Sequence, residues 1–266
     1  MFFDILKSVI LGVVEGITEF LPISSTGHLI ILNQWISFDE NFTKLFDVFI
    51  QLGAILAAVV YFWHRIWPFG RTETDRKIIF DTWKKAAIGV MPAIIIGGVA
   101  GKKIQESLFN PWVVAVALIV GGIILIIIDR KENQQNRIQS VAQIKIKEVV
   151  LIGLAQCLAM IPGTSRSAST IVAALLLGAS RVVAVEFSFF LAIPTMLAAS
   201  AYSLLKHGLS LSYSEISILA VGFFVSFIVA LSVIKYFLRF IEKNNFRSFG
   251  YYRIALGILV LIVFFS

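Results

Sequence analysis

The feature that most constrains this chain is a series of long uncharged runs. Five of them hold between 16 and 22 consecutive residues without Asp, Glu, Lys or Arg. They cover 48–63, 86–101, 107–128, 187–205 and 216–234. A sixth run, 248–266, is interrupted only by Arg253. Because a helix needs about 20 apolar residues to cross a bilayer, the sequence predicts six transmembrane helices.

Composition excludes the main alternatives to a helical membrane protein. Of the 266 residues, 58% are hydrophobic and only 15% are charged, against about 25% charged in soluble domains. A single soluble core cannot hold that apolar excess, and disorder needs the opposite composition. The runs are continuous rather than alternating, which disfavours a transmembrane barrel. The net charge of +7 is interpreted as a mark of cytoplasmic loops, not of nucleic-acid binding.

Two further apolar regions are broken by polar residues. Region 2–37 is interrupted by Pro22 and by the string that ends at His28, and region 149–180 is interrupted at 162–167. The halves of the second region hold 13 and 14 residues, and 14 helical residues reach only about 21 Å of a ~30 Å hydrocarbon core. We therefore expect two re-entrant helix–loop–helix hairpins, protected by surrounding protein or a water-filled cavity.

The two broken regions are related by an internal repeat. A shift of 140 residues aligns Pro22 with Pro162 and Ser25 with Ser165. Each broken region is followed by three spans, an odd number, so the second copy must be inverted in the membrane. The expected fold is an all-α polytopic membrane protein, a single domain over 1–266 with an inverted-topology repeat. Its parts are repeat one (1–129, with hairpin 2–37), a linker (130–147) and repeat two (148–266, with hairpin 149–180).

The basic residues predict the orientation in the membrane. One set of loops carries 15 of the 23 Lys and Arg residues, and the loops on the opposite side carry 5. The basic set comprises 64–85, 130–147, 178–181 and 239–247. The positive-inside rule places this set in the cytoplasm and both termini outside it. The first hairpin then enters from outside and the second from the cytoplasm, so that their polar tips can meet.

Glu15 and Glu19 are the first candidates for chemistry. Four residues apart, they share one face of a helix, and ionisable residues within a membrane segment are functional candidates. Two adjacent carboxylates repel unless a proton or cation neutralises them. A divalent cation, Mg²⁺ or Ca²⁺, completed by phosphate oxygens, would do so. A surface helix facing water and a proton site in a transporter are the alternatives.

The segment that follows supplies hydroxyls and a base. Pro22 ends the helix, and three hydroxyl residues precede Gly27 and His28. Ser24, Ser25 and Thr26 could cap the next helix or act as nucleophile and ligand contacts, while Gly27 permits close backbone approach. A lone histidine is usually structural, but His28 lies within reach of hydroxyls and carboxylates and is a candidate base.

The second break carries the complementary charge. Arg166 is the only charged residue between Glu148 and Arg181, and a buried guanidinium needs an anion, for which phosphate geometry is suited. Its neighbours could form an anion nest at the start of the next half-helix. They are Gly163, Thr164, Ser165 and Ser167. The alternative is a structural ion pair of Arg166 with Glu19 or Glu15. The two interpretations are compatible if Arg166 pairs with a glutamate in the absence of substrate and binds phosphate in its presence.

These two segments carry a resemblance to a known family. EGITEFLPISSTGH (15–28) and PGTSRSAST (162–170) resemble the two signature segments of the bacterial undecaprenyl-diphosphate phosphatase family, also called the bacitracin-resistance family. FIQLGAIL (49–56) and FSFFLAIP (187–194) are similar to further family features. The resemblance extends over essentially the whole chain.

The resemblance implies a function and a set of residue roles. The implied reaction converts undecaprenyl diphosphate to undecaprenyl phosphate and inorganic phosphate, which recycles the lipid carrier of cell-wall synthesis and confers bacitracin resistance. The implied acidic motif is Glu15 and Glu19, the serine–histidine element runs from Ser25 to His28, and the arginine is Arg166. A divalent cation, the bacterial cytoplasmic membrane and a site open to the extracytoplasmic side are also implied.

Several alternatives stay open from the sequence. Ser25, a water or His28 could be the nucleophile, and a homodimer is neither required nor excluded. A secondary transporter would share the inverted repeat, and a flippase for undecaprenyl phosphate would share the binding site without chemistry. An acid-phosphatase type of membrane lipid phosphatase is disfavoured, because PGTSRSAST contains neither the histidine nor the aspartate that such a site uses.

Overall fold

The computed structural model is all-helical and describes residues 1–130, 137–207 and 211–265. The only extended pairing in these residues is an isolated bridge between Ile138 and Ala179. The linker predicted at 130–147 lies partly outside the described residues, and so does the segment 205–214 between the fourth and fifth uncharged runs. The helices, in chain order, are α1 (Phe2–Thr18), α2 (Ser25–Leu32), α3 (Glu40–Tyr61), α4 (Trp63–Ile66), α5 (Glu73–Leu108), α6 (Pro111–Arg130), η1 (Val141–Gln143), α7 (Ile146–Gln156), η2 (Cys157–Met160), α8 (Arg166–Leu176), α9 (Arg181–His207), α10 (Tyr213–Lys243) and α11 (Arg247–Phe265).

Six helices of the described residues are long and apolar enough to cross a membrane, which confirms the predicted spans. They lie within α3, α5, α6, α9, α10 and α11. Each of these helices overlaps one of the six uncharged runs, although α3 ends before its run does and α6 begins after its run has begun. Two of the helices in the broken regions are too short to span, since α8 has 11 residues and α2 only 8, about 17 Å and 12 Å of helix. Helix α1 is longer, with 17 residues.

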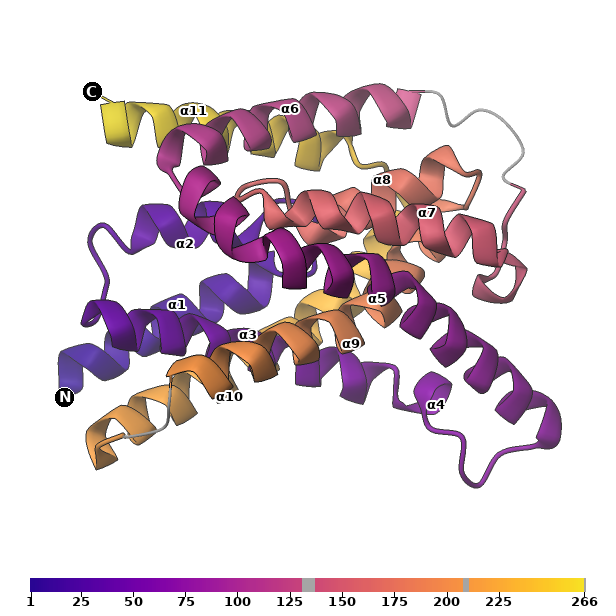
Figure 1. Ribbon diagram of the computed structural model, residues 1–266, viewed down its shortest axis with the longest axis horizontal. Helices are drawn as coiled ribbons and strands as arrows, with labels where there is room; N and C mark the ends of the chain where they lie inside the picture. Colours follow the sequence, from indigo (N-terminus) through magenta and orange to yellow (C-terminus); the bar gives the residue numbers. More distant parts are fainter. Residues whose placement is uncertain (131–136, 208–210, 266) are drawn as a thin grey trace.

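The two broken regions form helix pairs at opposite ends of the long axis. In Figure 1, α1 runs inward from the end that holds both termini and α2 returns toward it, while α7 begins at the other end. Helix α1 ends at Thr18 and α2 begins at Ser25; η2 ends at Met160 and α8 begins at Arg166. Two loops, 19–24 and 161–165, therefore interrupt helical structure inside the molecule. We call them the first loop and the second loop.

Helix packing around the two loops follows a matched pattern. Helix α1 packs on α10 and α7 packs on α5, while α6 lies along α11 and α3 contacts both α9 and α10. Small residues allow the close approaches. A Cβ on Gly12 would lie 2.8 Å from the carbonyl oxygen of Gly222, and a Cβ on Gly153 would overlap that of Gly89.

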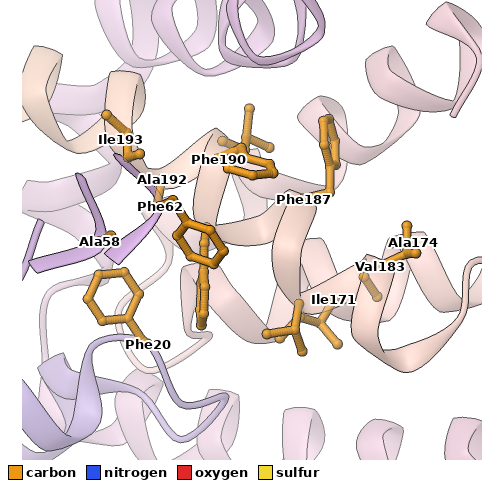
Figure 2. Close-up of a cluster of buried hydrophobic side chains, with 14 of the residues drawn as sticks. Phe20, Ala58, Phe62, Ile171, Ala174, Val183, Phe187, Phe190, Ala192 and Ile193 are labelled. Atoms are coloured by element: carbon orange, nitrogen blue, oxygen red, sulfur yellow. The ribbon is translucent and has the colours of Figure 1, made fainter. Parts of the chain in front are cut away.

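A cluster of buried apolar side chains packs against the first loop and fixes its position. Phe20 of that loop is fully buried and its ring makes an edge contact with Phe189 at 5.0 Å between centroids. Figure 2 shows Phe20 beside Ala58 and Phe62 of the α3 end, in a cluster that continues to Phe187 and Phe190 of α9. Because Glu19 precedes Phe20, burial of this ring fixes where the carboxylate can lie.

Candidate active site

Each loop ends in a serine with a left-handed backbone. Ser24 has φ 71° and Ser165 has φ 70°, and they are the only non-glycine residues with positive φ in the described chain. Such strained residues cluster at functional sites. Each one caps the helix that follows: Ser24 Oγ accepts from Gly27 N at 3.3 Å, and Ser165 Oγ accepts from Ala168 N at 3.2 Å. The backbone thus pairs Ser165 with Ser24, one residue from the alignment that the 140-residue shift predicts.

The glycines of the two loops stand close to α6. Gly163 has φ 88°, and a Cβ there would lie 2.5 Å from the carbonyl oxygen of Val114. Gly27 faces Leu118, whose Cδ1 would lie 3.1 Å from an added Cβ. Thr26 is half-buried in the first turn of α2, and the Thr164 N–H donates to the carbonyl of Ile161 at 3.2 Å.

The centre of the site is the carboxylate of Glu19. Arg166 Nη2 donates to Glu19 Oε1 at 2.9 Å, and Ser25 Oγ donates to Glu19 Oε2 at 2.6 Å. The side chains of Arg166 and Glu19 are only 11% and 6% exposed. Ser167 Oγ completes the junction by donating to the carbonyl of Leu21 at 2.8 Å. The first loop and the first turns of α2 and α8 therefore meet at one place.

Arg166 makes contacts on several sides and still has N–H groups without an acceptor in the described part of the chain. Its Nη1 donates to the carbonyl of Ser188 at 3.2 Å, and its guanidinium carbon lies 5.9 Å from the centroid of the Phe20 ring. Its Nε has no hydrogen-bond partner among the described residues. A guanidinium so oriented can turn a remaining N–H toward a phosphate oxygen.

His28 is engaged by groups other than Ser25. Its Nδ1 lies 2.7 Å from the carbonyl oxygen of Ser24, and its Nε2 lies 2.7 Å from the hydroxyl of Tyr252. A carbonyl can only accept, so Nδ1 carries the proton and Nε2 accepts from Tyr252. The two rings also stack, with centroids 5.6 Å apart. The imidazole thereby ties the start of α2 to α11.

Glu15 is buried and without a partner. It is 1% exposed, and neither carboxylate oxygen has a hydrogen-bond donor among the described residues. In contrast, both oxygens of Glu19, one turn later, are used. An orphaned buried carboxylate next to a second one is a fit for a cation that a bound phosphate would complete. In the part of the chain that the structure describes, no group of three or more His, Cys, Asp or Glu side chains could hold a metal ion. Oxygens of a bound phosphate would therefore have to complete the coordination of a cation at Glu15 and Glu19.

The comparisons decide the family. A profile described as bacitracin resistance protein BacA matches residues 8–259. This chain belongs to the BacA family. The undecaprenyl-diphosphatase 1 of Oenococcus oeni is 50% identical over 98% of this chain and 97% of its own length. That of Clostridioides difficile is also 50% identical, with the same coverage, and the undecaprenyl-diphosphatase of Enterococcus faecalis is 45% identical over 98% of both chains. With its six long apolar helices, this BacA family member is a multi-pass membrane protein.

An apolar cavity adjoins the site in this BacA family member. It has a volume of about 470 Å³ and lies between α1, the first loop and α11. His28 and Tyr252 reach its wall. Its other lining residues are Val14, Ile17, Thr18, Leu21, Ile23, Ser248 and Phe249.

Two site residues are absent from the sequence predictions. Tyr252 binds His28 across 224 positions of the chain, and nothing in the sequence around Tyr252 signals that contact. Arg253 contacts both loops, although it is predicted above only as an interruption of the last span. Its sequence position alone could have identified it, because a charged residue within a membrane span is a functional candidate by default.

Proposed function

We propose that the junction of the two loops is the active site at which this chain hydrolyses undecaprenyl diphosphate to undecaprenyl phosphate and inorganic phosphate. Its relatives of equal length are undecaprenyl-diphosphatases. The single observation that carries the assignment of the site is the shared carboxylate. Glu19 accepts from Ser25, where α2 begins after the first loop, and from Arg166, where α8 begins after the second loop. A hydroxyl with a proton acceptor and an adjacent guanidinium are the elements that phosphoryl transfer needs.

Ser25 is the nucleophile in this proposal. Its oxygen bonds to the terminal phosphorus while the bond from that phosphorus to the bridging oxygen breaks, and undecaprenyl phosphate leaves. Glu19, 2.6 Å away, accepts the serine proton. Water then cleaves the phosphoserine to release inorganic phosphate. His28 is a weaker candidate for nucleophile or base, because both of its ring nitrogens are already engaged; its role is to hold the first loop.

Arg166 changes partner during the reaction. In the empty site it pairs with Glu19, and with substrate its free donors bind the terminal phosphate, where charge develops. The amide groups at the start of α8, with Thr164, Ser165 and Ser167, supply further donors. At the end of the first loop and the start of α2, Ser24, Thr26 and Gly27 line the other side of the proposed phosphate site.

A divalent cation, Mg²⁺ or Ca²⁺, is part of the proposal. Glu15 and Glu19 would hold it together with oxygens of the diphosphate, and when bound it neutralises phosphate charge. Support comes from the unpartnered oxygens of Glu15. The protein's own part is to keep a buried carboxylate ready beside the site.

The apolar cavity beside His28 fits the lipid part of the substrate. An isoprenoid chain must leave the polar site along apolar surface. This cavity is lined by mostly apolar residues of α1, the first loop, α2 and α11. Its hydrophobic walls bind the first isoprene units by removing them from water. The rest of the chain extends into the bilayer.

We also propose the predicted topology. The α1–α2 and α7–α8 pairs are re-entrant hairpins of an inverted repeat, over 1–129 and 148–266, and the site opens to the extracytoplasmic side of the bacterial cytoplasmic membrane. Support comes from the matched serines at 24 and 165 and from the α1–α10 and α7–α5 packing pairs. A homodimer is compatible with this arrangement, since the site is built within one chain.

The test is phosphate release by purified protein in detergent. Undecaprenyl diphosphate should yield inorganic phosphate with Mg²⁺ or Ca²⁺ present, and excess chelator should stop the reaction. Arg166→Ala should lose about a thousandfold or more in kcat, because a preorganised charge partner is removed. Release that persists in chelator would overturn the metal assignment, and release that persists in Arg166→Ala would overturn the site.

A further inference from the structure

A second buried guanidinium lies behind the two loops, on α11. Arg253 is fully buried. None of the ion pairs among the described residues involves it. Its N–H groups instead donate to five backbone carbonyls. The acceptors are Pro22 at 3.2 Å, Gly163 at 3.0 Å, Thr164 at 3.0 Å, Ala117 at 3.1 Å and Leu118 at 3.4 Å.

The chemistry of arginine explains these contacts: Nε and Nη1 donate to one carbonyl each, and the two N–H groups of Nη2 share three. The guanidinium stays protonated in proteins and offers five N–H donors in a fixed plane, and an unsatisfied buried charge is strongly destabilising. Carbonyls in a loop, unlike those in a helix, have no regular N–H partner. Arg253 and the loop carbonyls therefore satisfy one another, and neither set can move without leaving the other unpaired.

The acceptors lie beside the residues that carry the reaction. Pro22 precedes Ser25 by three residues, and Thr164 precedes Arg166 by two. The remaining two acceptors belong to α6, the helix that lies along α11. One planar group thus fixes the first loop, the second loop and α6 relative to one another.

We propose that Arg253 is a positioning residue for the hydrolysis, which holds Ser25 and Arg166 in register by bonding the carbonyls of both loops. It touches neither the substrate nor the reacting atoms. The proposal rests on the proposed function. Since misplacement of a reacting group by about 1 Å can reduce a rate about a hundredfold, loss of this clamp should lower kcat. The KM should change little, because neither Arg253 nor any of its five acceptors lines the apolar cavity that receives the lipid chain.

The neighbouring helix offers a way to disturb Arg253 without mutating it. A Cβ on Gly121 of α6 would meet the guanidinium, with Cζ 2.8 Å and Nε 3.2 Å away. Gly121→Ala should therefore displace the guanidinium while leaving its charge in place. Gly98→Ala, in α5, is a matched control, because a Cβ there meets nothing within 4 Å.

The experiment measures kcat and KM for undecaprenyl diphosphate, normalised to folded protein, in four variants. We expect a loss of kcat of about a hundredfold in Arg253→Met and a smaller loss of about tenfold in Arg253→Lys and Gly121→Ala. In each, KM should stay within about threefold of the parent, and Gly98→Ala should match the parent. Arg253→Lys should recover part of the activity, because an ammonium keeps the charge but has only three donors.

Thermal unfolding in detergent separates positioning from folding. If Arg253→Met does not fold, the Lys and Gly121→Ala variants still decide the outcome. Parental kcat in both of these folded variants would overturn the positioning role, and so would a rate loss that merely follows the loss of folded protein. If the parent itself releases no phosphate, the proposed function fails instead, which is a different result.

Discussion

At the scale of single residues, Glu19 makes the decisive contacts. Its two carboxylate oxygens are divided between Ser25 and Arg166, so one side chain joins the nucleophile to the phosphate-binding charge. This division also separates the roles of the two acidic residues. Glu19 acts on the proton of Ser25 and shares the proposed cation, while Glu15, with both oxygens unpartnered, serves the cation alone.

Substitution of Ser25 distinguishes two mechanisms. We expect Ser25→Ala to abolish nearly all activity and expect a phosphoserine to be trapped in the parent by rapid acid quench, because the serine oxygen forms the covalent intermediate. Ser165→Ala should lose less, since Ser165 binds phosphate. Partial activity without an adduct would instead assign the attack to water, and a phosphohistidine at His28 would overturn both.

Glu15→Gln tests the cation. The amide keeps the size of the side chain but removes the charge, so the concentration of Mg²⁺ or Ca²⁺ that gives half-maximal phosphate release should rise at least tenfold. Glu19→Gln should lose activity at every metal concentration, because it also loses the proton acceptor of Ser25. Equal metal dependence in the parent and Glu15→Gln would refute the assignment.

At the scale of elements, glycines decide how closely the half-length helices approach the spans. Short helices such as α7 cannot cross the membrane, so their position depends on packing against α5. Gly153 meets Gly89 of α5 at a backbone-to-backbone contact that leaves no room for a Cβ. In a membrane, where apolar surface alone gives little preference for a partner helix, such close packing is a main source of association.

Gly153→Ala should destabilise the protein by about 1–3 kcal/mol through overpacking. The sign of the change in stability is informative, because replacing glycine by alanine in an unhindered helix stabilises the protein by up to about 1 kcal/mol. Gly101→Ala, where no atom lies within 4 Å, is the control and should be neutral or stabilising. The measurement is the midpoint of thermal unfolding in detergent; a Gly153→Ala midpoint at or above that of the control would contradict the packing.

At the scale of the whole molecule, two loops that enter from opposite ends meet at one site. In Figure 1 both termini lie at one end of the long axis, and α4 and the start of α7 lie at the other. The proposed orientation places the latter end in the cytoplasm, because the segments 64–85 and 137–147 are rich in Lys and Arg and the positive-inside rule assigns such segments to the cytoplasmic face.

Cysteine labelling in intact cells tests this orientation. In a chain with Cys157 replaced by serine, Ser107→Cys should react with an impermeant maleimide, and Thr74→Cys should be protected until the cells are opened. Both positions are exposed in the structure, and charged neighbours flank each of them, Glu73 and Asp75 around residue 74 and Lys103 and Glu106 before residue 107. Labelling of residue 74 together with protection of residue 107 would invert the proposed topology.

The spans and the residue types of the site can be predicted without any coordinates. A bilayer sets the length of uncharged helix, so six spans are readable from runs of residues without any knowledge of packing. The polar breaks around Ser25 and Arg166 are readable for the same reason, since polar groups at membrane depth require a function.

Which of these residues contact one another depends on how the helices pack. The contacts of His28 with Tyr252 and of Arg253 with Pro22 join positions 224 and 231 residues apart, and no local pattern encodes them. The same holds for the pairing of Ser24, rather than Ser25, with Ser165, because it depends on the positive φ that packing imposes on both. Hydrogen bonds form between atoms brought within about 3 Å, and it is the packing of α11 on α6 that brings these atoms together.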